Sequence, residues 1–437
     1  MKTITLSLLL FTTLVVNAEH AADRGERKAD SSNLSLGAVT SAVLADNLAI
    51  KEALRKWDAM KERIPQAAAW DDLKISAESE FKRFIQIQPN AFTDQALSVE
   101  QVLPISGKNR ARARMAAAEA LSAYEDVRRA QLDAISAARA SYFRLANVYD
   151  QLEINRRNLV SLKQIADISR SKYETGAESA ANVIVAETDY SKLLETQRDL
   201  ERRLSDEQSQ LNRLMNRDAF APIGALAAAA IAPPDLSVTR LRELTLSHRP
   251  ELQMARTKID AEKSRLQLAH REWIPDPAVG VKAQRYNDAA QAVSELDAGI
   301  SFSVPWGNYR KYSAEVREAR DAVAAAEHAL DRSQKEALQR LRDQLEKIET
   351  AHHHVELFRD KIMPQARQAF EANQFSYESG KASFLDWITA QRNLRDIEAT
   401  AREHLADYQI AVAELEAITG AQVYPLPEDI KPSKKLR

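Results

Sequence analysis

Residues 172–179 read KYETGAES, and residues 376–383 read SYESGKAS. The two phrases share Tyr, Glu and Gly at matching places, and their tyrosines, Tyr173 and Tyr377, are 204 residues apart. Both phrases interrupt long stretches rich in Ala, Glu, Arg and Leu, which are residues that favour helix. The recurrence of one unusual phrase at such a distance indicates that one unit of the chain has been duplicated.

Each phrase has the composition of a turn between two helices. Gly176 and Gly380 can adopt the positive φ that reverses the chain at a helix end. Ser179 and Ser383 follow three residues later, and a Ser at that point can cap the next helix. We therefore predict two antiparallel helical hairpins, each with one of the phrases at its tip.

Further matches between the two halves keep the same order and nearly the same offset. Residues 34–47 match 236–249 at an offset of 202, and the later matches are Leu103-Pro104 with Val304-Pro305, and Leu211 and Leu214 with Leu415 and Ile418. We predict two repeats, 34–216 and 236–420. A Pro- and Ala-rich linker at 217–235 joins them.

The hydrophobic period changes at the same place in each repeat. Apolar residues occupy every second position from Leu296 to Val304, with Asp, Gly and Ser between them, as in a strand with one apolar and one polar face. Similar alternation predicts one β-hairpin per repeat, with strands at about 73–88, 92–104, 277–286 and 295–304.

The remaining segments have helical composition and spacing. We predict helices at 36–68 and 238–272 before the hairpins, and return helices at about 180–216 and 383–419. The helices that follow the hairpins, 108–172 and 308–375, would each be about 95–100 Å long at 1.5 Å per residue. Pro364 is expected to kink the second of these.

The two ends of the chain have their own character. Residues 1–18 combine Lys2, an apolar run and a small-residue ending at Ala18, which is typical of a secretory signal peptide. We expect an N-terminal extension at 19–33 and a C-terminal tail at 421–437. The chain contains no cysteine, which excludes disulfides and a lipidated N-terminal Cys.

Two hairpins cannot close a barrel, because a four-stranded sheet leaves edges that lipid cannot satisfy. Bacterial barrels begin at about eight strands, so several copies would have to share one wall. In that arrangement the apolar faces of the strands meet lipid, and the long helices project into the periplasm as a tube.

The duplicated halves, the Leu-Pro and Val-Pro exits from the hairpins, and the phrase formed by Tyr377, Gly380 and Asp386 resemble the TolC family of outer-membrane efflux factors. The resemblance implies a mainly α homotrimer with a shared 12-stranded membrane β-barrel, four strands per protomer, continuous with a long α-helical barrel. It implies a passive exit duct in the outer-membrane lipid that docks to a periplasmic adaptor (membrane fusion protein) and an inner-membrane pump of the resistance-nodulation-division type. The runs 380–386 and 362–366 look more like the heavy-metal branch than the drug branch.

The resemblance also assigns roles to residues. Tyr173, Gly176, Ser179, Tyr377, Gly380 and Ser383 correspond to helix tips that contact the adaptor. Asp386 corresponds to an acidic residue at the periplasmic aperture, and its counterpart in the first repeat is Asn182. The alternative interpretation is that the tip residues only form turns and that Asp386 is a solvated surface carboxylate.

Several other functions are not indicated. A net charge of −2 gives no basic surface for nucleic acid, and no phosphate loop or nucleophile motif indicates an enzyme. Three consecutive histidines, His352 to His354, point about 100° apart on a helix and cannot converge on one ion. Glu349 with His353, or His352 with Glu356, stand at i, i+4 and could form weak two-ligand sites. We expect solvated histidines, no metal site and no cofactor. A periplasmic coiled-coil spacer or adaptor remains the competing functional hypothesis, although the sequence lacks the Gly-rich β domain of an adaptor.

Overall fold

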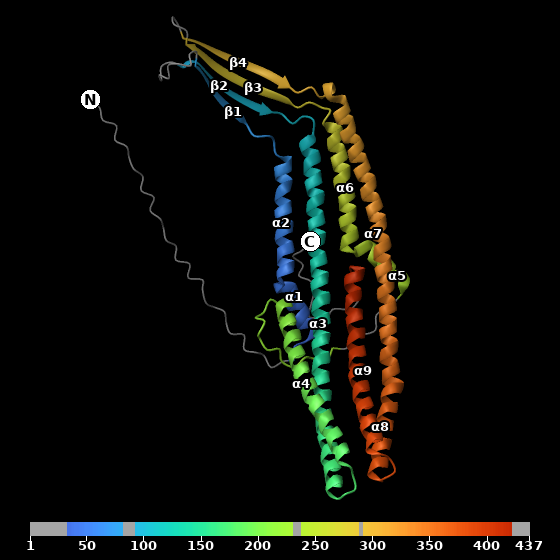
Figure 1. Ribbon diagram of the computed structural model, residues 1–437. Coiled ribbons are helices and arrows are strands. Elements are labelled where there is room, and N and C mark those ends of the chain that lie inside the picture. Colours follow the sequence, from blue (N-terminus) through green and yellow to red (C-terminus); the bar gives the residue numbers. More distant parts are fainter. Residues whose placement is uncertain (1–32, 82–91, 230–236, 288–291, 422–437) are drawn as a thin grey trace, which may run out of the picture.

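The computed structural model describes residues 33–81, 92–229, 237–287 and 292–421. The predicted signal peptide, nearly all of the N-terminal extension, the distal end of the first strand, part of the linker and nearly all of the C-terminal tail lie outside these residues. Within them the molecule is a long bundle of helices with a sheet at one end and two helical turns at the other (Figure 1).

Each repeat contributes a pair of short helices and a long antiparallel hairpin. In the first repeat α1 (Leu36–Asp46) and α2 (Leu48–Ala68) pack beside α3 (Lys108–Glu174), and α4 (Ala180–Leu214) returns along α3. In the second, α5 (Val238–His248) and α6 (Pro250–Arg271) are followed by α7 (Tyr309–Leu357), α8 (Met363–Glu378) and the returning α9 (Phe384–Thr419). Helix α3 alone has 67 residues, or about 100 Å at 1.5 Å per residue.

The helices predicted at 36–68 and 238–272 are each divided in two, which the sequence prediction missed. Asn47 separates α1 from α2, and its side-chain oxygen accepts hydrogen bonds from the backbone N–H groups of Ala49 and Ile50. Arg249 separates α5 from α6, directly before Pro250, which opens α6. A cap in one case and a proline in the other therefore end the first helix of the pair.

These two break residues make equivalent contacts in the two repeats. Asn47 donates from its side-chain amide to the carbonyl of Leu214 at 2.9 Å, near the end of α4. Arg249 donates from its guanidinium to the carbonyl of Ile418 at 3.3 Å, near the end of α9. Each break thus supplies a side-chain donor to the C-terminal end of the returning helix, where carbonyls lack helical partners.

The second long helix is interrupted where a kink was predicted at Pro364. Residues Phe358–Ile362 form one π-helical turn between α7 and α8. Proline lacks a backbone donor and crowds the preceding turn, and a π turn is one of the ways in which a helix accommodates such a fault. The joint between α7 and α8 is therefore a local irregularity in an otherwise continuous rod.

The four strands form one antiparallel sheet in the order β1 (Lys74–Phe81), β2 (Phe92–Val102), β3 (Pro277–Asn287) and β4 (Ala292–Phe302). The two predicted hairpins are confirmed, and they join through the pairing of β2 with β3. Among the described residues the sheet ends at β1 and β4, so each of these two strands has an edge that no other described strand covers.

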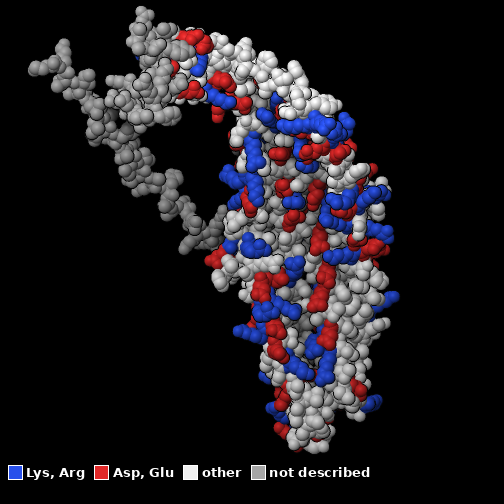
Figure 2. Space-filling view, turned by 45° about the horizontal axis from the view of Figure 1, so that its top comes forward, with Lys and Arg blue, Asp and Glu red and all other residues white. Residues whose placement is uncertain are grey.

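The register aligns the alternating residues into two chemically different faces. One row across the sheet pairs Ile75 with Val99, Val99 with Val281, and Val281 with Ala298. The adjacent row on the opposite face contains Ser76, Ser98, Lys282 and Asp297. The apolar side chains are not covered by the rest of the chain, since Ile75 is 66% and Leu296 is 73% exposed. Figure 2 shows a largely uncharged area over the strands, in contrast to the intermixed charges along the helices.

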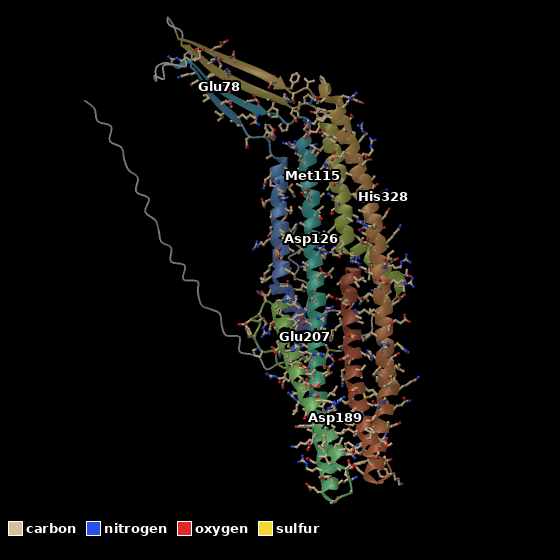
Figure 3. All side chains as sticks on the ribbon, in the orientation of Figure 1. Glu78, Met115, Asp126, Asp189, Glu207 and His328 are labelled. Atoms are coloured by element: carbon tan, nitrogen blue, oxygen red, sulfur yellow. The ribbon has the colours of Figure 1, made fainter. Side chains whose placement is uncertain are left out.

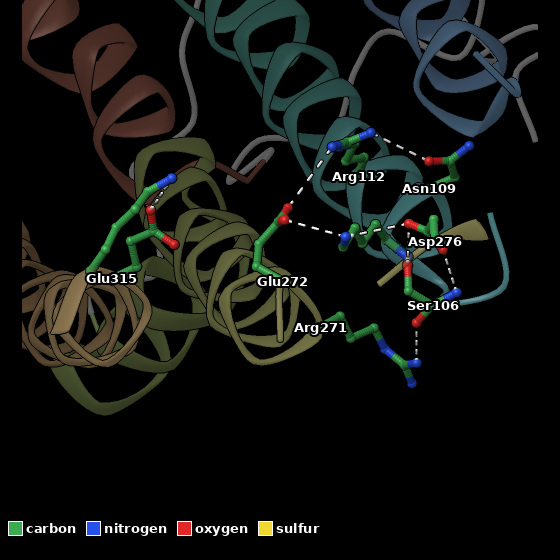
Figure 4. Close-up of polar contacts among 9 residues, drawn as sticks. Ser106, Asn109, Arg112, Arg271, Glu272, Asp276 and Glu315 are labelled. Carbon is green, nitrogen blue, oxygen red and sulfur yellow. Dashed lines mark hydrogen bonds and ion pairs between the residues drawn. The ribbon is translucent and has the colours of Figure 1, made fainter. Parts of the chain in front are cut away.

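A polar cluster fixes the sheet to the helical body (Figure 4). Asp276, just before β3, accepts from the backbone N–H and the hydroxyl of Ser106, both at 2.8 Å. Lys108 Nζ lies 3.3 Å from Asp276 and 3.4 Å from Glu272, and Arg271 donates to the Ser106 carbonyl at 2.6 Å. The exit from β2 and the entry to β3 are thereby held together across the two repeats.

Candidate functional site

The two helical turns at the far end of the bundle have the same backbone geometry. Gly176 has φ +74° and Gly380 has φ +76°. The Gly176 N–H bonds to the carbonyl of Tyr173 at 2.9 Å, and the Gly380 N–H bonds to that of Tyr377 at 3.1 Å. The next residue in each turn bonds five residues back, which completes a Schellman motif. The predicted role of both glycines in reversing the chain is confirmed.

The serines that follow begin the returning helices as predicted. Ser179 accepts from the Ala181 N–H through its hydroxyl. Ser383 forms a full capping box with Asp386, in which the Asp386 carboxylate accepts from the Ser383 hydroxyl at 2.7 Å and from its N–H at 3.1 Å. These hydrogen bonds, from the hydroxyl first and then from the backbone, lower the pKa of Asp386. Asp386 is thus an exposed, ionised capping residue in the single chain.

The two tip tyrosines have different environments. Tyr173 is 50% exposed, whereas Tyr377 is only 4% exposed. The Tyr377 ring stacks on Trp387 at a centroid distance of 4.8 Å, and Lys172 Nζ lies over the ring, 3.7 Å from its centre. Of the two tyrosines, only Tyr173 therefore has an exposed ring, while the ring of Tyr377 packs within the tip.

Tyr377 also connects the two repeats through Glu178. Its hydroxyl donates to Glu178 Oε2 at 2.5 Å, and the other carboxylate oxygen of Glu178 accepts from the Asn182 side chain. Burial, followed by the hydrogen bond and the negative charge of Glu178, raises the pKa of Tyr377 to about 12. Asn182, predicted as the counterpart of Asp386, thus donates to the carboxylate that joins the tips.

A second polar connection lies farther from the tips, where Asp189 is labelled in Figure 3. Asp189 on α4 is buried, and its carboxylate accepts from Arg392 Nε on α9 at 2.6 Å. Gln391 donates to Asn158 on α3 at 2.9 Å in the same region. The hairpin of the first repeat and the hairpin of the second are therefore joined by polar side chains away from the tips as well as at them.

Asp386 also lines a groove between α8 and α9. The groove has a volume of about 630 Å³ and is mostly apolar, with Leu385, Ala366 and Ala369 among its lining residues. Among the described residues no hydrogen bond joins Asp386 to Asn182, so one protomer alone does not bring the two predicted aperture residues together.

A family model for outer membrane efflux proteins matches residues 39–217 and 241–421. The chain belongs to this family. The two matched segments agree with the two-repeat organisation predicted from the sequence. No curated protein sequence matches the chain.

Solved structures resemble this outer membrane efflux protein in fold. The outer membrane protein VceC of Vibrio cholerae is 17% identical with a TM-score of 0.74, over 89% of this chain and 96% of that one. The CmeC outer membrane channel of Campylobacter jejuni is 16% identical with a TM-score of 0.74, over 97% and 95%. The open state of the MtrE outer membrane channel of Neisseria gonorrhoeae is 14% identical with a TM-score of 0.71, over 89% of each chain.

Membership of the family fixes the broad function. The chain is the outer-membrane channel component of an efflux system, with its helical part in the periplasm, and it is not an enzyme. Channels of this family are trimers that work with a periplasmic adaptor and an inner-membrane pump. The competing hypothesis of a periplasmic spacer or adaptor is therefore set aside. No helix among the described residues is long and apolar enough to cross a membrane.

The residues that join the two tips were not predicted from the sequence. Lys172 and Glu178 stand inside the first quoted phrase, so a signal was present, but nothing in the phrase identified Tyr377 as their partner. Phe384 and Trp387, which bury Tyr377, have Ala180 and Val183 as their equivalents in the first repeat. This difference in size between the repeats is a sequence signal for the buried tyrosine.

Proposed function

We propose that this efflux protein forms a homotrimeric passive duct whose wall closes through pairing of β1 with β4 of the neighbouring copy. The open edges of the four-stranded sheet carry this proposal. Three copies supply twelve strands, which exceeds the minimum of about eight for a bacterial barrel. The edge pairing also satisfies backbone groups that lipid would leave without partners.

Disulfide cross-linking tests this closure directly, because the natural chain has no cysteine. Ser76→Cys in β1 combined with Asp297→Cys or Ser301→Cys in β4 should give covalent dimers and trimers on oxidation. Ser98→Cys in the inner strand β2 combined with the same β4 cysteines is the matched control, and it should give no covalent dimers or trimers. Cross-linked species that form equally in both sets would contradict the proposed closure.

Aromatic residues support a position for the membrane boundary. Trp70 and Trp306 are each 61% exposed and Tyr309 is 65% exposed, all near the junction of the sheet with the helices. Trp and Tyr with one apolar and one polar side favour the membrane interface. The apolar face of the sheet beyond them, which includes Ile75 and Leu296, would then face the lipid.

The helix tips are the proposed docking end. Among the described residues the turns at Gly176 and Gly380 lie at the end of the bundle opposite the sheet (Figure 1), so with the sheet in the membrane they would extend into the periplasm. The exposed ring of Tyr173 offers an apolar contact to a periplasmic adaptor, and Ser179 and Ser383 set the start of the helices beside it. The pump is proposed to be of the resistance-nodulation-division type, and it supplies the energy.

Asp386 and Asn182 are proposed to contribute to the periplasmic aperture. Three copies of an ionised Asp386 around a threefold axis would form an acidic ring that attracts cations and repels anions. The ionised state is supported by the capping hydrogen bonds that lower the pKa of this carboxyl. Reconstituted channels should therefore become less cation-selective when Asp386 is replaced by Asn, while Asp396→Asn, farther along α9, should have a small effect.

Heavy-metal cations are the proposed cargo, on the resemblance of residues 380–386 and 362–366 to that branch. The test is the growth of a deletion strain with zinc, cobalt or copper, with and without the gene restored. Purified protein should also conduct ions in a planar bilayer as a trimer. Conductance without a metal phenotype would support the proposed duct and contradict only the proposed cargo. A monomer without conductance would contradict the proposed duct itself.

A further inference from the structure

Two histidines from different helices face each other in the middle of the second repeat. His354 lies near the end of α7 and His404 lies on α9, and their ring centroids are 4.7 Å apart with the planes inclined by 47°. Both residues are half-buried between the helices. The last member of the triplet His352 to His354 therefore has a partner on another helix, 50 residues later in the sequence.

Other side chains of the two helices pack around this pair. The ring of Phe358 contacts His404 edge-on at a centroid distance of 4.8 Å. One turn away, His352 packs against Tyr408 at 5.4 Å, and its Nδ1 lies 3.7 Å from the carboxylate of Glu356. The exposed His353 is farther from His354, at 6.4 Å between ring centres.

The spacing of the rings fits a shared metal ion. A metal–nitrogen distance of about 2.0–2.1 Å places the centres of two imidazoles on one ion about 4.5 Å apart for a right-angled arrangement and about 5.2 Å apart for a tetrahedral one. The observed 4.7 Å lies between these values. Within the described ranges no group of three or more His, Cys, Asp and Glu residues converges, so water would complete the coordination.

We propose that His354 and His404 form an open binding site for one divalent transition-metal ion, with copper(II) bound most tightly. Imidazole nitrogens suit copper, nickel and zinc, and copper(II) leads this series in affinity. A bound ion links α7 to α9 directly before the π turn Phe358–Ile362. It therefore holds the joint between α7 and α8 against the returning helix, whatever cargo passes through the duct.

The test uses the full-length mature protein in detergent, with any affinity tag removed. The parent and all variants also carry His20→Gln, because cleavage after Ala18 would leave His20 as the second residue, where it can chelate copper together with the N-terminus. Electron paramagnetic resonance with one equivalent of copper(II) reports the number of coordinating imidazole nitrogens. Calorimetric titration with the same ion reports its affinity. The matched controls are His353→Gln and His328→Gln. His353 lies beside the site, and His328 is an exposed residue on α7 that is labelled in Figure 3.

The expected spectrum of the parent protein shows two imidazole nitrogens, and His354→Gln and His404→Gln each show at most one. Each of these two substitutions should weaken copper binding by at least about tenfold, since the loss of even an outer partner of a metal ligand has that effect. The two control variants should bind copper like the parent. Binding should also weaken as the pH falls, because protons compete for the nitrogens.

Two results would overturn the site. One is a parent spectrum with a single nitrogen, which requires no variant and so does not depend on how the variants fold. The other is an equal loss of affinity in His353→Gln or His328→Gln, which would indicate scattered binding to surface histidines. Unchanged melting of His404→Gln without copper checks that the substitution has not disturbed the helices.

Discussion

The hydroxyl of Tyr377 in the second repeat donates a hydrogen bond to Glu178 in the first, with 2.5 Å between the two oxygens. The contact joins the tips of two hairpins that are otherwise linked mainly along their shafts. Because Tyr377 is buried and Glu178 also accepts from Asn182, the bond is part of a small network and not a chance surface contact. The tips of one protomer are therefore expected to move as a unit.

Tyr377→Phe should loosen this connection while it retains the ring. The stacking on Trp387 persists, but the carboxylate of Glu178 loses one of its two donors. A hydrogen bond to a charged group contributes about 1.5–3 kcal/mol, so we expect faster amide exchange at 172–182 and a larger single-channel conductance.

Tyr173→Phe is the matched control, since the equivalent ring in the first repeat is half exposed. A substitution at such a surface site generally changes stability by less than about 0.5 kcal/mol. Equal amide exchange in the two variants would show that the Tyr377 hydroxyl does not hold the tips together.

The same tyrosine predicts a change at alkaline pH. Burial, with Glu178 acting in the same direction, raises the pKa of Tyr377 to about 12 in the folded protein, compared with about 10 for an ordinary tyrosine. The contribution of the protonated Tyr377 hydroxyl to the free energy of unfolding is fully present below about pH 10 and is lost as the pH rises toward about 12. The difference in tyrosinate absorbance between the parent and Tyr377→Phe should therefore appear near pH 12 and not near pH 10.

Glu178→Gln separates the two causes of this shift. Removal of the carboxylate charge should lower the pKa of Tyr377 but not return it to the ordinary value, because burial is the larger cause. A titration that is the same with and without the Glu178 charge would contradict the hydrogen-bonded arrangement of the tip.

The sequence predicted the features that depend on local pattern. The alternation of apolar and polar residues at Leu296–Val304 predicted that strand to within a few residues. The glycines of the two quoted phrases predicted the turns between the helices. Features that depend on partners distant in the sequence were not predicted. The composition around Asn47 is helical, but Asn47 caps α2 with its side-chain oxygen while its amide contacts the distant Leu214 carbonyl. His404 likewise has no local feature that relates it to His354.

The glycine turns predict a graded series of stabilities. An added Cβ at Gly176 or Gly380 would meet no atom within 4 Å, so Ala there should cost only the conformational penalty of about 1–2 kcal/mol. Gly420 has φ +70°, and a Cβ there would lie 2.5 Å from the Arg249 backbone. Gly420→Ala should therefore lower the melting temperature far more, or prevent assembly.

Gly224→Ala is the neutral reference for this series. Its φ lies outside the left-handed region, and a Cβ would meet no atom within 4 Å. The melting temperatures of the four variants, measured in the same detergent, give the order of their stabilities. A loss at Gly380 as large as that at Gly420 would show that the tip makes contacts beyond those of one protomer.

The pair formed by Asp189 and Arg392 predicts an asymmetry between two substitutions. The Asp189 side chain is 4% exposed, whereas that of Arg392 is 37% exposed. Arg392→Ala leaves a buried carboxylate with only Lys192 at 3.5 Å, at a cost of about 3 kcal/mol, which is typical of a broken buried pair. Asp189→Ala leaves a guanidinium that water can reach, so the loss should be nearer about 1 kcal/mol. Melting of the two variants and of the double variant measures both losses, and a larger loss for Asp189→Ala would contradict the burial of its carboxylate.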